Sequence, residues 1–174
     1  VYKRQGGGLP GWQDWVVVDG DDPFVNPFPP EHDPILQMAV IGSGAATAYF
    51  GLTDLGELKE GDSVLISAAA GATGSVAVQT AVNLGATVVG IAGSDDKCRW
   101  VEELGAEVCL NRRTEDLTAR LKEIRPKGFD IYFDNVGGDI LDIALRRLAI
   151  GARVVIIGAI AMYNMKGRPP GPSN

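Results

Sequence analysis

The stretch from Asp62 to Gly85 constrains the fold of this 174-residue chain more than any other part. It begins with a short run of β-branched and aliphatic residues, 63–67, which has the composition of a buried strand. A turn of small residues follows, and apolar residues then recur at helical spacing as far as Gly85. A strand, a glycine-containing turn and a helix in this order are the context in which many proteins hold a phosphate at a helix N-terminus.

The turn has the pattern Ala68-x-x-Gly71-x-x-Gly74, which is one glycine short of the usual dinucleotide-binding fingerprint. Gly71 permits a tight turn and a close approach of the backbone to a ligand, and Gly74 permits close packing of the helix on the strand. The same letters also suit a plain turn of small residues in other α/β proteins. The pattern by itself therefore leaves both interpretations open.

Beyond Gly85 the chain keeps alternating between strand and helix patterns. Four further strands are predicted, at 87–92, 107–110, 129–133 and 152–158. In the first intervening helix Trp100, Val101 and Leu104 are expected to face the sheet, and the last helix is expected to reach Leu148. Alternation at this spacing predicts parallel strands joined by right-handed crossovers. The predicted fold class is α/β, a doubly wound parallel sheet of the Rossmann type.

The first part of the chain has a different character. Residues 12–19 predict one strand, and the proline-rich residues 23–34 predict an extended linker. Residues 35–58 predict a mostly helical connector, with a helix start near its paired glycines. Residues 1–5 include no starting Met and fit no element, so they are set aside as foreign to the fold. We expect the chain to be a fragment of a longer protein.

Composition and charge exclude several classes of function. A net charge of −6 argues against nucleic acid or an anionic membrane as the main partner. Cys98 and Cys109 have neither the number of a disulfide framework nor the spacing of a metal site. The longest apolar run, 154–162, is much shorter than the ~20 residues that span a bilayer. With no signal peptide visible, a cytoplasmic location is expected.

In a doubly wound sheet the ligand lies at the carboxyl ends of the strands. An NAD site usually has an acid after the second strand, about 20 residues beyond the glycines, which binds the ribose 2′-OH. Here Gly93 and Ser94 stand at that position, and Lys97 follows in the predicted helix. These residues suit a 2′-phosphate better, although Lys97 alone is also compatible with a solvated helix surface. The pattern favours NADP(H) as the cofactor.

The other strand ends also carry polar residues or glycine. Arg112 and Arg113 follow the third predicted strand and either face the adenosine phosphate or are plain surface charge. Asn135 follows the fourth strand and is a candidate to bond the ribose on the nicotinamide side, while Asp134 is expected to brace the turn. Small residues at 158–161 allow backbone groups to approach a carboxamide. Together these strand ends predict a nucleotide site.

Several segments, in matching order, resemble the zinc-free medium-chain reductases of the prostaglandin reductase and alkenal double-bond reductase type. The matching segments are 47–52, 68–74, 90–97, 133–138 and 158–164. The resemblance implies NADPH-dependent reduction of the carbon–carbon double bond of α,β-unsaturated aldehydes and ketones, with hydride delivered to the β-carbon. It also implies that residues 1–30 end a GroES-like substrate domain and that 31–174 form the NADP-binding domain, truncated at its C-terminus. We expect a homodimer at full length and no activity from the fragment alone.

The resemblance also assigns roles by position. The cofactor-binding residues would be Thr47, Gly71, Ala72, Thr73, Gly74, Gly93, Ser94, Lys97, Arg112, Asn135, Gly158, Ala159 and Ile160. Gly71 and Gly74 match the pyrophosphate loop, and Lys97 matches the 2′-phosphate lysine. Tyr163 matches the active-site tyrosine and is the candidate catalytic residue, a donor to the carbonyl oxygen where charge develops. Packing of its ring against the cofactor explains Tyr163 almost as well.

Two segments depart from the family pattern: residues 111–113, and the connector, which reads Ser43-Gly44-Ala45 in place of the usual Met-Pro-Gly. The family usually has Asn-Tyr-Lys at 111–113, so Arg112 stands in place of the tyrosine. Ser43 stands where zinc-containing relatives have a ligand cysteine, so no metal is expected. The alternatives left open are a quinone oxidoreductase of the same superfamily and a non-catalytic nucleotide-binding fragment. A short-chain reductase is disfavoured because Tyr163 and Lys166 are three residues apart and not four.

Overall fold

A computed structural model describes residues 4–6, 21, 25–27, 31, 33, 35, 42–165 and 167. The chain divides into two compact units, Val1–Gly42 and Ser43–Asn174. The strand predicted at 12–19 lies outside the described residues. The assignment of 1–30 to a substrate domain and of 31–174 to a cofactor domain stays a prediction.

The described part of the first unit contains two short strands. These are β1 (Arg4–Gly6) and β2 (Val25–Pro27), which pair antiparallel with Gln5 opposite Asn26. The predictions that residues 1–5 fit no element and that 23–34 form an extended linker are therefore wrong at the paired residues 4–5 and 25–27. The proline content favoured a linker, but β2 is an edge strand of a two-stranded sheet, where proline's missing N–H donor is tolerated.

The second unit is built on a five-stranded sheet in the order β5-β4-β3-β6-β7, with every pair parallel. Its strands are β3 (Ser63–Ser67), β4 (Thr87–Ala92), β5 (Val108–Asn111), β6 (Phe129–Asp134) and β7 (Leu148–Ile156). The helices are α2 (Ser43–Phe50), a π-helical turn η1 (Gly51–Leu55), α3 (Ala72–Asn83), α4 (Asp95–Glu103), α5 (Leu117–Ile124) and α6 (Gly138–Leu145). The predicted doubly wound parallel sheet is confirmed. Within the described residues, no helix has the length and apolar character needed to cross a membrane.

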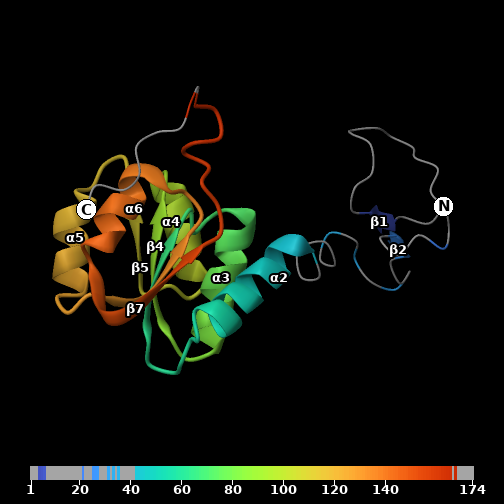
Figure 1. Ribbon diagram of the computed structural model, residues 1–174, viewed down its shortest axis with the longest axis horizontal. Coiled ribbons are helices and arrows are strands. Elements are labelled where there is room, and N and C mark those ends of the chain that lie inside the picture. The colour runs from blue at the N-terminus through green and yellow to red at the C-terminus, as the bar shows by residue number, and fades with distance from the viewer. Residues whose placement is uncertain are drawn as a thin grey trace. The chain divides into compact units, whose positions relative to one another are not determined.

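Helices cover both faces of this sheet (Figure 1). Because successive side chains on a strand point to opposite faces, Val64 and Ile66 pack with α3 and α4, while Leu65 packs with α5 and α6. α2 lies against α3, and the turn η1 that follows α2 adds the buried Leu52 to the first layer. All strands being parallel, their carboxyl ends and the starts of α3, α4, α5 and α6 share one edge of the sheet.

Three details differ from the sequence-based expectations. β5 begins at Val108 and continues through Asn111, one residue beyond its predicted end. α6 ends at Leu145, and Leu148 opens β7 because the Phe129 N–H donates to the Arg147 carbonyl and draws the chain into the sheet early. Trp100 is 43% exposed. α4 instead turns Cys98 and Val101 inward, one helical turn apart.

Candidate functional site

The turn between β3 and α3 leaves a helix N-terminus open. Ala68 has a left-handed φ of 47°, and Gly71 takes the N-cap position in an extended conformation. No side chain caps α3, and its first turn contains no acid. The first N–H groups of a helix have no partner inside the helix and form the positive end of its dipole. This turn is therefore suited to bind an anion.

The two glycines of the turn differ in how tightly they are packed. A Cβ at Gly74 would lie 2.2 Å from the Ala68 carbonyl oxygen and 3.0 Å from Ala69 Cα. A Cβ at Gly71 would lie 3.1 Å from the same oxygen, which also accepts a hydrogen bond from the Gly71 N–H. The close approach of α3 to the turn thus requires glycine at position 74 and only favours it at position 71.

A cavity of about 640 Å³ opens at the carboxyl edge of the sheet. It is lined by Ala68, Ala70, Gly71, Ile91, Ala92, Gly93, Ser94, Lys97, Arg112, Arg113, Val136, Ile140, Ile160 and Ala161. Six predicted cofactor residues are in this lining: Gly71, Gly93, Ser94, Lys97, Arg112 and Ile160. The sequence analysis did not single out Val136 and Ile140, since apolar residues beside a glycine turn give no signal that separates a cavity wall from core.

Three cations line this cavity. Lys97 comes from the first turn of α4, and Arg112 and Arg113 directly follow β5. A Cβ at Gly93 would lie 3.9 Å from Arg112 Nε and 4.0 Å from Arg113 Nε, so both guanidinium groups border the end of β4. None of the three forms an ion pair with a described residue. By contrast, four other arginines pair with carboxylates: Arg99, Arg120, Arg125 and Arg153.

A fully buried carboxylate organises the turn after β6. Asp134 accepts hydrogen bonds from Ser67 Oγ at 2.9 Å, from the Tyr132 hydroxyl at 2.7 Å and from the Gly137 N–H at 3.0 Å. A charge is tolerated inside a protein only with such partners. Burial, with the Asp134 charge nearby, raises the pKa of Tyr132, so its hydroxyl stays protonated and donates. Asp134 braces the turn, as the sequence predicts.

The residues predicted for the nicotinamide side gather at the ends of β6 and β7. Asn135 donates its side-chain N–H to the Ser67 carbonyl at 2.7 Å. A Cβ at Gly158 would lie 3.0 Å from the Asn135 carbonyl oxygen and 3.3 Å from the Tyr163 hydroxyl. Tyr163 is 68% exposed, and its hydroxyl accepts a hydrogen bond from the Ala159 N–H at 3.2 Å. Because the oxygen is the acceptor there, the hydroxyl proton is still able to be donated.

The remaining predicted residues lie around the cavity and do not line it. Thr47 is half-buried on α2, and Ala72 is exposed at the first position of α3. Thr73 faces α2, where a Cβ at Gly44 would lie 3.3 Å from Thr73 Oγ1. The structure brings α2 and the start of α3 together, and Thr47 is not part of the cavity lining.

A family profile described as zinc-binding dehydrogenase matches residues 72–170. The chain belongs to this family, the medium-chain dehydrogenase/reductases. Among the relatives of this chain, the NADPH-dependent curcumin reductase of Escherichia coli (strain K12) is 40% identical over 95% of this chain and 48% of its own length. Prostaglandin reductase 1 of Bos taurus is 41% identical over 94% of this chain and 51% of its own length.

A crystal structure of CurA from Vibrio vulnificus in complex with NADPH has a TM-score of 0.83 and 37% identity, and the match covers 94% of this chain and 48% of that one. The chain thus spans about half the length of the curated relatives it matches. The resemblance to the prostaglandin reductase type of medium-chain reductase is confirmed by these identities. The family's name refers to zinc. In the described part of this chain, no three His, Cys, Asp or Glu side chains are grouped to hold a metal ion, and Ser43 is exposed.

Proposed function

We propose that this chain binds NADPH within an ene reductase that reduces the carbon–carbon double bond of α,β-unsaturated aldehydes and ketones. One observation carries the cofactor assignment: one cavity is bordered by the uncapped start of α3 and by three cations that have no carboxylate partner among the described residues. A phosphate-rich ligand is the chemistry that such a site accommodates. The names of the curcumin and prostaglandin reductases support the choice of NADPH and of reduction.

The residues present fit the parts of a dinucleotide. The N–H groups at the start of α3, next to Gly71, would bind the pyrophosphate, and the Cβ-free surface at Gly74 keeps that turn compact. Lys97 and Arg112 would bind the 2′-phosphate. Asn135 would hold the ribose on the other side. The backbone at 158–160 would line the nicotinamide, which when bound supplies the hydride for the β-carbon.

Tyr163 is the proposed hydrogen-bond donor to the carbonyl oxygen of the substrate, while the β-carbon receives the hydride and the α-carbon a proton. Negative charge builds on that oxygen as the double bond is reduced, and a positioned donor stabilises it. Two features support this role: the side chain is 68% exposed, and its hydroxyl accepts from the Ala159 N–H, which orients the oxygen and leaves the proton free. The intact enzyme would act on a small molecule. Homodimerisation and a cytoplasmic location are part of the same proposal.

The test is carried out on the intact protein by titrating NADPH and NADH and then following NADPH oxidation with methyl vinyl ketone or a simple quinone. NADPH is expected to bind more tightly, and the enone is expected to be reduced. Exchange of Lys97 for Ala should narrow the affinity gap by about 1–2 kcal/mol, the range for a charge-assisted contact. Lys59→Ala, outside the cavity lining, is the control and should leave the gap unchanged.

Two results would count against the proposal. Equal affinities for the two cofactors in the wild-type protein would remove the 2′-phosphate assignment. Turnover with the quinone but not with the enone would replace the ene reductase by a quinone oxidoreductase.

A further inference from the structure

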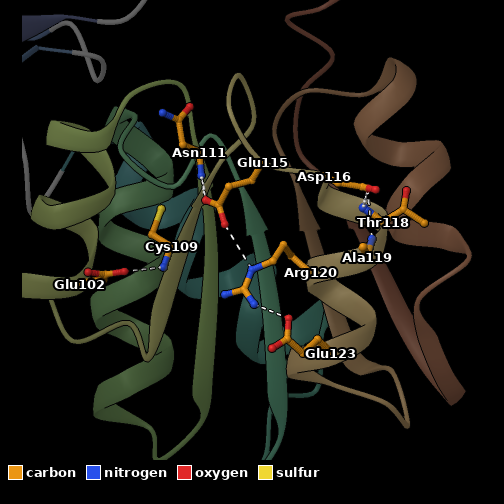
Figure 2. Close-up of polar contacts among 9 residues, drawn as sticks. All are labelled: Glu102, Cys109, Asn111, Glu115, Asp116, Thr118, Ala119, Arg120 and Glu123. Atoms are coloured by element: carbon orange, nitrogen blue, oxygen red, sulfur yellow. Dashed lines mark hydrogen bonds and ion pairs between the residues drawn. The ribbon is translucent and has the colours of Figure 1, made fainter.

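Asn111 joins the two segments that carry the cations of the cavity. It is the last residue of β5 and only 6% exposed. Its side-chain N–H donates to Asp95 Oδ1 at 2.6 Å, and its side-chain oxygen accepts from the Arg113 N–H at 3.1 Å. Its own backbone N–H donates to Glu115 Oε1 at 2.8 Å, as Figure 2 shows. One buried amide therefore links the first turn of α4 to the loop after β5.

The loop after β5 is held at both of its first residues. The Arg112 N–H donates to the Ala92 carbonyl at 3.0 Å, and the Arg113 N–H donates to Asn111. These bonds place both arginines beside Gly93, where each Nε lies about 4 Å from the position of a Cβ, as noted above. A loop ordered before the ligand arrives loses less conformational entropy on binding. The backbone of the arginine pair is therefore preorganised for binding an anion.

The side-chain amide of Asn111 also fixes the orientation of an acidic side chain, Asp95. Asp95 is the first residue of α4, two positions after Gly93, at the edge of the strand end where NAD enzymes place a ribose-binding carboxylate. A free carboxylate there would repel a 2′-phosphate and offer an acceptor to a 2′-hydroxyl. The hydrogen bond to Asn111 directs the Asp95 carboxylate toward β5.

We infer that Asn111 is a positioning residue for the choice of NADPH over NADH. Its side chain holds the backbone of Arg113 beside Gly93, next to Arg112, and keeps the Asp95 carboxylate away from the phosphate. The inference rests on the proposed binding of NADP(H). The sequence pattern gave no reason to suspect it, because β5 was predicted to end at residue 110 and Asn111 would then belong to an open loop.

The experiment measures how much the 2′-phosphate alone contributes to nucleotide affinity. Calorimetry on the full chain compares 2′,5′-ADP with 5′-AMP in the wild type and in Asn111→Leu, which keeps the branched shape of the side chain but removes both of its hydrogen bonds. The affinity ratio of the two nucleotides is expected to fall about five- to tenfold, the size of one charge-assisted contact. The affinity for 5′-AMP should not decrease, since the released Asp95 carboxylate is an acceptor for the 2′-hydroxyl.

Two further variants separate positioning from loss of structure. Asn111→Asp has nearly the same shape and places a second carboxylate against Asp95, so the ratio should fall here too, even if the leucine variant does not fold. Asp116→Ala removes the cap of α5 in the same connection without touching Asn111, and should leave the ratio unchanged. An unchanged ratio in both Asn111 variants, or an equal fall in Asp116→Ala, would overturn the inference. A wild-type chain that binds both nucleotides equally would overturn the proposed function itself.

Discussion

The β3–α3 and β5–α5 connections lie at the same edge of the sheet and begin helices in opposite ways. α3 starts after Gly71, with no side-chain cap and no acid in its first turn. α5 starts after Asp116, whose carboxylate accepts from the Thr118 and Ala119 N–H groups at 3.0 and 3.2 Å (Figure 2). The same backbone donors are thus left available in one turn and satisfied internally in the other.

At this edge of the sheet the start of α3 is therefore suited to bind an anion, whereas the start of α5 contributes to the stability of the fold. A cap such as Asp116 contributes to folding but occupies the donors that an anion would use. An uncapped helix start lacks that stabilisation and gains a site for a negative charge. The cations reinforce the contrast, because Arg120 in α5 pairs with Glu115 and Glu123, whereas Lys97 has no such partner among the described residues.

The largest effect is expected from Gly74→Ala, which pushes α3 away from its turn. The added Cβ would lie 2.2 Å from the Ala68 carbonyl oxygen, a backbone atom that cannot move aside alone. The free energy of unfolding should fall by about 3 kcal/mol or more, and the site at the start of α3 should be lost. Urea denaturation measures the first and NADPH titration the second. Gly71→Ala is the control, and equal destabilisation by both changes would contradict the assigned packing.

Placing a capping acid at the uncapped start of α3 should have the next largest effect. Gly71 has φ −84° and ψ 172°, an extended conformation that suits a capping acid. Gly71→Asp is expected to leave the unfolding free energy nearly unchanged, because the new cap offsets the 3.1 Å contact of its Cβ with the Ala68 carbonyl oxygen. It is expected to weaken NADPH binding by about 2–3 kcal/mol through charge repulsion. Fluorescence titration of NADPH checks this. Gly71→Asn carries the same shape without the charge, and an equal loss of affinity in both variants would show that repulsion is not the cause.

Removing the Asp116 cap from the start of α5 should have the smallest effect. Asp116→Ala removes two hydrogen bonds from the start of α5 and should lower the unfolding free energy by about 1 kcal/mol. Thermal or urea unfolding measures this loss, and Asp116→Asn should recover most of it because an acceptor oxygen remains. NADPH affinity should stay at the wild-type value. A marked fall in affinity would mean that the two turns are not functionally separate.

Much of the second unit could be predicted because its signals are local. The strand at 87–92 coincides with β4 (Thr87–Ala92), and the glycine turn stands between β3 and α3 as expected. Alternation of strands and helices restricted the sheet to a parallel, doubly wound form. The site prediction used the same logic, since the carboxyl ends of parallel strands must meet. Six of its residues do line one cavity, while their roles in binding stay predictions.

The failures lie where partners are distant in the sequence or where one residue changes the outcome. β1 pairs with β2, which lies about twenty residues further along the chain, and no pattern within either strand predicts its partner. Asn111 lies inside β5 and not after it, and this single residue decides whether its amide is buried. Ala68 takes a left-handed φ that its side chain does not favour, so composition gives no sign of it.

The sequence by itself determined the fold class, the order of the elements and the strand ends at which polar residues gather, since periodicity and glycine positions act over a few residues. Only the tertiary structure decided which polar residues form hydrogen bonds with one another. Ser67 binds Asp134 from 67 residues away, and Asn111 binds Asp95 across 16. Such bonds depend on strand order and burial, because a polar group taken out of water must find a partner wherever the packed sheet provides one.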